Sequence, residues 1–71
     1  MNNAEGSRLK GVATRGQLRG YRVEVWPADP EGWDVLYFPP AGGAVEYNSW
    51  AEDWAMVLEY GDLYGVTWED D

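Results

Sequence analysis

Carboxylates are the side chains in this sequence that are best able to do chemistry. The chain of 71 residues has 13 Asp and Glu but no His and no Cys, so it lacks the groups most often used as base, nucleophile or transition-metal ligand near neutral pH. Two carboxylates alone can cleave a glycosidic bond, but they need a cleft that a domain of this size hardly provides. We therefore expect no catalytic residues and no enzymatic activity.

Two clusters of carboxylates place oxygen atoms close together in the sequence, as Ca²⁺ requires. They are Asp29, Glu31 and Asp34, and Glu69, Asp70 and Asp71. Neither has the spacing of a calcium-binding loop, and Pro30 interrupts the first. We expect weak, non-specific cation binding, with no functional metal site and no cofactor.

The charges are separated along the chain. Residues 1–22 hold every basic residue and sum to +4, whereas residues 23–71 sum to −12. Such an anionic field repels nucleic acid and acidic membranes and attracts cationic clefts. Solubility is the alternative explanation, but a surface evolved only for solubility usually mixes both signs. The predicted partner is therefore a positively charged nucleic-acid-binding protein, with no direct binding to nucleic acid or membrane.

The spacing of the carboxylates also suits such a partner. Carboxylates two residues apart on a strand are about 6.6 Å apart, and those three or four apart on a helix are similarly spaced, close to successive phosphates of a nucleic acid. An Arg or Lys cleft that binds phosphate would accept them. The candidate partner-binding residues are Asp29, Glu31, Asp34, Glu52, Asp53, Glu59, Asp62, Glu69 and Asp70.

The aromatic content indicates a folded domain. Hydrophobic residues make up 45% of the chain, too many for a disordered acidic tail. A small domain needs large side chains in its core, so we expect most of the five tryptophans there and one or two at the surface as binding anchors. We predict a flexible N-terminus over residues 1–8 and one domain over residues 9–71.

Four strands and their connections are suggested by the pattern. Residues 21–26 alternate as a half-buried strand does, and residues 33–38 form a second strand after a Pro- and Gly-containing turn. A loop with two prolines then precedes a short third strand over residues 44–47. Residues 63–68 suggest the last strand. Residues 9–19 are ambiguous between an edge strand and a helical turn, and their arginines are expected to fold back onto the acidic body.

One helix is predicted over Trp50 to Tyr60. Ser49 and Glu52 have the spacing of a capping box, and Gly61 is a natural C-terminal stop. The expected fold is α+β, a small antiparallel sheet of three to four strands in the order β-β-(β)-α-β, with the helix packed on one face. No apolar stretch is long enough for a signal peptide or a membrane span, so a cytoplasmic location in a host bacterial cell is expected.

The stretch SWAEDWAMVLEYGDLYGVTWEDD, with the acidic hairpin before it, resembles the small acidic anti-CRISPR proteins of phages and mobile elements that mimic DNA. The resemblance lies in size and charge, because that group shares no sequence motif. It implies an inhibitor, monomeric or dimeric, that occupies the DNA-binding site of a bacterial defence complex, above all a CRISPR effector.

Two other functions remain open from the sequence. An immunity protein for a nuclease toxin would also cover a basic nucleic-acid site with carboxylates. A plain acidic interaction or dimerisation domain would instead use its exposed aromatic residues.

Overall fold

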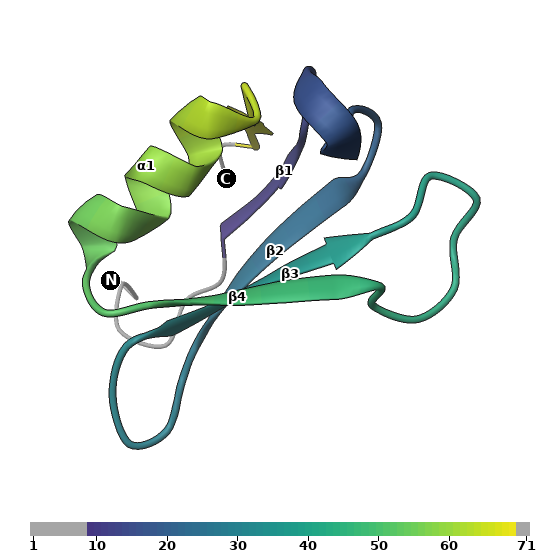
Figure 1. The fold of residues 1–71 in the computed structure, drawn as a ribbon. Coiled ribbons are helices and arrows are strands. Elements are labelled where there is room, and N and C mark those ends of the chain that lie inside the picture. The colour runs from purple at the N-terminus through teal and green to yellow at the C-terminus, as the bar shows by residue number, and fades with distance from the viewer. Residues whose placement is uncertain (1–8, 70–71) are drawn as a thin grey trace.

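The computed structural model describes residues 9–69, which form one five-stranded antiparallel sheet and a single α-helix (Figure 1). The predicted α+β class is confirmed. The strands follow the order β4-β3-β2-β1-β5, so the chain meanders through four strands, crosses one face as the helix and returns to pair with β1. The elements are β1 (Leu9–Val12), a 3₁₀ turn (Gly16–Leu18), β2 (Arg22–Pro27), β3 (Trp33–Phe38), β4 (Tyr47–Ala51), α1 (Trp54–Leu63) and β5 (Thr67–Trp68).

The segment that the sequence left ambiguous contains β1. With this strand the sheet has five strands, whereas three or four were predicted. The ambiguous segment forms both a strand and a helical turn. β1 lies inside the sheet, between β2 and β5, rather than at an edge. Gly11 permits this, because a Cβ atom there would lie 2.5 Å from the Thr67 carbonyl oxygen. The predicted flexible segment, residues 1–8, lies outside the described residues.

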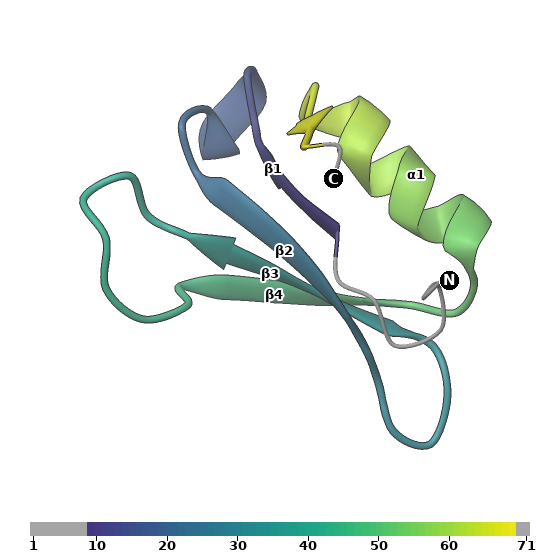
Figure 2. The same cartoon turned by 180° about the vertical axis from the view of Figure 1, so that it is seen from behind.

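The core lies between α1 and one face of the sheet, as Figures 1 and 2 show from opposite sides. Its largest fully buried side chains are valines, Val23, Val25, Val35 and Val57. The prediction that most tryptophans are core residues is wrong. Trp26, Trp50 and Trp54 are exposed, and Trp33 and Trp68 are only partly buried.

The start of the helix also differs from the prediction. Residues up to Ala51 belong to β4, where Ala51 pairs with Trp33, so Ser49 and Glu52 do not form a capping box. Asp53 is the N-cap instead, and its Oδ1 accepts a hydrogen bond from the Met56 amide at 3.0 Å. The pairing of β4 with β3 thus overrides the local capping pattern.

The helix ends later than predicted. Gly61 lies inside α1 and is buried against Trp68, whereas the chain turns at Gly65, whose φ of +59° suits glycine. Arg15 satisfies the carbonyl groups at this end, because its guanidinium donates to the backbone oxygen atoms of Asp62 and Leu63.

Candidate interface at the acidic end of the sheet

The turn between β2 and β3 and the connection from β4 to α1 lie at the same end of the sheet. Trp33 pairs with Ala51, so both segments continue beyond the same rung of the ladder. In Figures 1 and 2 the turn and the start of α1 are at the same end of the sheet, and the turn bends away from the helix. We call this region the acidic end, and its carboxylates are Asp29, Glu31, Glu52 and Asp53.

Tryptophan contacts hold the two segments together. The Trp50 indole nitrogen donates to the backbone oxygen of Glu31 at 3.2 Å. The rings of Trp33 and Trp54 meet edge to face, with centroids 4.8 Å apart. Gly32 leaves space for Trp50, because a Cβ atom there would lie 2.5 Å from the indole nitrogen. The relative position of the two acidic segments is therefore fixed by packing.

The four carboxylates of the acidic end are all on exposed residues. Within residues 9–69 none of them forms an ion pair, because the two ion pairs there join Arg15 to Asp62 and Arg22 to Glu24. Asp53 uses one oxygen to cap the helix and leaves the other available. An exposed group of unneutralised carboxylates presents acceptors to a cationic surface.

The other predicted partner-binding residues do not join this group. Asp34 lies on the open face of the sheet, between Trp26 and Trp50 on the neighbouring strands. Glu59 and Asp62 lie along α1, and Glu69 lies beside Lys10 at the opposite edge of the sheet. Asp70 is outside the described residues. The helix predicted over Trp50 to Tyr60 would carry Glu52, Asp53 and Glu59 together, but the first two precede α1.

Two of the arginines that the structure describes form ion pairs with carboxylates of the domain. Arg15 lies 3.9 Å from the Asp62 carboxylate, and Arg22 lies 3.4 Å from the Glu24 carboxylate. Both are remote from the β2–β3 turn, because Arg22 begins β2 and Arg15 contacts the end of α1. The expected neutralisation is therefore seen for Arg15 and Arg22, and neither of them covers the acidic end.

Trp54, like Trp50, is a residue of this site whose burial the sequence predicted wrongly. The sequence predicts most tryptophans in the core, whereas Trp54 is the first residue of α1 and is 38% exposed. It directly follows Asp53, so an aromatic surface adjoins the carboxylates. Recognising Asp53 as the N-cap would have placed Trp54 at the first position of the helix.

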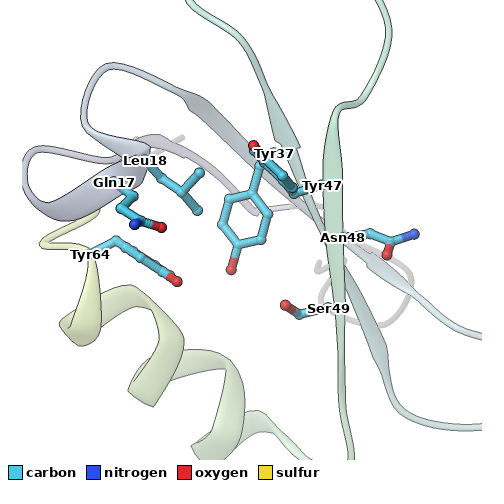
Figure 3. Close-up of a pocket in the computed structure, with 7 residues that line it drawn as sticks. All are labelled: Gln17, Leu18, Tyr37, Tyr47, Asn48, Ser49 and Tyr64. Atoms are coloured by element: carbon cyan, nitrogen blue, oxygen red, sulfur yellow. The ribbon is translucent and has the colours of Figure 1, made fainter.

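A separate pocket of about 280 Å³ lies at the other end of the sheet, beside the end of α1 (Figure 3). The Tyr37 hydroxyl points into it, toward the hydroxyls of Tyr64 and Ser49, and forms no hydrogen bond with the described residues although Tyr37 is only 2% exposed. Burial raises the pKa of Tyr37, and the nearby Ser49 hydroxyl opposes this. No carboxylate lines the pocket, so it is not part of the acidic end.

Within residues 9–69 no group of three or more carboxylates is arranged to hold a metal ion. The first sequence cluster, Asp29, Glu31 and Asp34, is divided between the turn and the open face. In the same part of the chain, no helix has the length and apolar character needed to cross a membrane. Comparisons with models of protein families, with curated proteins and with solved structures found no match.

Proposed function

We propose that this protein is a stoichiometric inhibitor that occupies the DNA-binding site of a bacterial defence complex, with a CRISPR effector in the cytoplasm of the host cell as the favoured target. The observation that carries the proposal is the acidic end. Two segments distant in the sequence place four carboxylates on exposed residues at one end of the sheet, and no basic residue follows Arg22 in the chain.

The physical basis is electrostatic complementarity. Clefts that grip DNA present Arg and Lys side chains, whose donors pair with carboxylates as they do with phosphates. The net charge of −8 would also speed encounter with a cationic cleft, by about tenfold or more at low salt. The exposed face of Trp54 supplies apolar contact beside the charges. Occupancy alone then excludes DNA, without a chemical step.

The test is competition for DNA on a panel of purified CRISPR effector complexes, with binding of labelled target DNA measured by fluorescence anisotropy. One effector is expected to lose DNA binding when the protein reaches a one-to-one ratio. If every effector of the panel retains its DNA, the proposed target class is wrong.

Charge reversal locates the site. Glu31→Lys with Glu52→Lys is expected to weaken inhibition by about 100-fold, because two attractive contacts become repulsive. Glu59→Lys with Glu69→Lys changes the net charge equally but lies on the helix and the far edge, so it should weaken inhibition only a few-fold. Equal losses would show that net charge acts rather than the acidic end. Asp53 is left unchanged, since losing its cap would cost about 1 kcal/mol of stability.

The immunity-protein alternative uses the same chemistry and is tested in parallel. A panel of purified nuclease toxins replaces the effectors, and nuclease activity is the readout. Tight inhibition of one toxin, with no effect on any effector, would replace the proposal by that function.

A further inference from the structure

The face of the sheet opposite α1, which we call the open face, carries large apolar side chains. They alternate with the buried ones along β1 to β4 and are Val12, Trp26, Leu36, Phe38 and Trp50. Val12, Trp26 and Trp50 are 42%, 37% and 48% exposed. The solvent side of an antiparallel sheet is ordinarily polar. A contiguous group of exposed apolar residues on that side therefore marks an interaction surface.

The charges of the open face are balanced, unlike those of the rest of the described chain. Lys10 and Arg22 share it with Glu24 and Asp34. Carboxylates outnumber bases elsewhere, so two copies of the chain repel each other through most of their surfaces. The open face lacks the excess of carboxylates that would select a cationic partner. A second copy offers the same balanced charges and the same apolar area.

The register shows how two copies would fit. Arg22 pairs with Phe38 in one row across the strands, and Trp26, Asp34 and Trp50 form another row. The two rows are four residues apart on β2, which is about 13 Å. Consider a two-fold axis that lies between the two sheets, perpendicular to the strands and midway between the two rows. This axis exchanges the rows: it places the first row of one copy over the second row of the other.

This exchange brings opposite charges together. Asp34 of one copy comes to lie over Phe38 of the other, because both residues are on β3. The guanidinium of Arg22 already rests over the Phe38 ring, 4.5 Å from its centroid. We propose that the open face binds a second copy of this chain in this way, with Arg22 of each copy facing Asp34 of the other.

The dimer is a sandwich of two sheets with a helix on each outer side. Sheets packed face to face keep their strands within about 30° of each other, which matches strands related by this axis. Since the axis reverses the strand direction, the two acidic ends point in opposite directions and stay accessible. The proposal uses the open face alone and does not depend on the proposed function.

Sedimentation velocity over a range of protein concentrations tests it. The wild-type chain is expected to be a dimer, and Arg22→Asp and Asp34→Arg are each expected to raise the dissociation constant at least about tenfold, because like charges then face each other. An equimolar mixture of the two variants is expected to form a heterodimer, in which both pairs of opposite charge are restored. Leu63→Lys, on the helix side and 61% exposed in the wild type, is the control that should remain dimeric.

The mixture makes the result independent of folding defects, because two misfolded variants would not rescue each other. A wild-type chain that stays monomeric at the highest concentration overturns the proposal. So do variants that dimerise as the wild type does, or a mixture that stays monomeric while circular dichroism shows both variants folded.

Discussion

The two faces of the sheet differ in the burial and in the size of most of their apolar side chains. Beneath α1 most of the fully buried side chains are small or medium: Val23, Val25, Val35 and Ala51 are each no more than 1% exposed, and the ring of Tyr37, at 2%, is the large exception. The open face holds Trp26 and Trp50, both more than a third exposed. Hydrophobicity alone would place the largest side chains in the core. The difference teaches that the distance between helix and sheet decides which side chains are buried.

Close approach on the covered face depends on residues without bulk. A Cβ atom on Gly61 would lie 2.7 Å from the Trp68 ring, and one on Gly11 would lie 2.7 Å from a methyl group of Val66. The partly buried Trp68 thus lies against the backbone of α1 at Gly61. Gly61 makes room for this ring on the covered face, whereas the rings of Trp26 and Trp50 lie on the open face.

The same truncation on the two faces tests this contrast. Val25→Ala is expected to lower the free energy of unfolding by about 2 kcal/mol, because it removes buried methyl groups and leaves a cavity. Val12→Ala on the open face should cost less than about 0.5 kcal/mol, since that side chain is 42% exposed. Urea denaturation measures both. Equal costs would mean that the open face is as well packed as the covered one. Val12 also lies in the proposed dimer face, so the measurement belongs at a concentration where the chain is monomeric.

Gly61→Ala tests the close approach itself. Alanine is ordinarily about 1 kcal/mol better than glycine inside a helix, yet here the added methyl group meets Trp68. We expect a net loss of about 1–2 kcal/mol from overpacking. Ala55→Gly, at an exposed position of α1, should also destabilise, by about 1 kcal/mol. Stabilisation by Gly61→Ala in thermal unfolding would show that Trp68 moves away at no cost.

The sequence predicted the features that depend on neighbours along the chain. The alternation of Val23 and Val25 with polar residues gave β2, and the turn at residues 28–32 gave the hairpin with β3. There the Ala28 amide donates to the Gly32 carbonyl at 2.9 Å, as turn residues favour. The α+β class followed from these local patterns.

The features that depend on distant partners were missed. Ser49 and Glu52 match a capping box, but the ladder between β3 and β4 claims residues up to Ala51. The place of β1 inside the sheet required β5, whose two residues come more than 50 positions later. The acidic end was anticipated as a set of carboxylates, yet which of them gather depended on the pairing of Trp33 with Ala51.

Tyr37 is the point where the covered face is incompletely satisfied. Its ring is buried, and within residues 9–69 its hydroxyl, which points into the pocket of Figure 3, has no hydrogen-bond partner. Tyr37→Phe removes only the oxygen. At pH 7 we expect a change in the free energy of unfolding of less than about 0.5 kcal/mol, because no protein hydrogen bond is lost. This is the smallest effect expected here, but the pH dependence of the free energy of unfolding distinguishes Tyr37→Phe from the wild type.

Burial raises the pKa of Tyr37 above its ordinary value of 10.0, so the hydroxyl ionises more readily in the unfolded chain than in the folded one. The free energy of unfolding of the wild type should therefore fall as pH rises above 10, and that of Tyr37→Phe should fall less. Tyr47→Phe, at a tyrosine that is 51% exposed, serves as the matched control in urea denaturation. A loss above about 1 kcal/mol at pH 7 in Tyr37→Phe would mean that the hydroxyl is bonded, through water, in the native protein. The covered face would then owe part of its stability to a polar contact as well as to its valines.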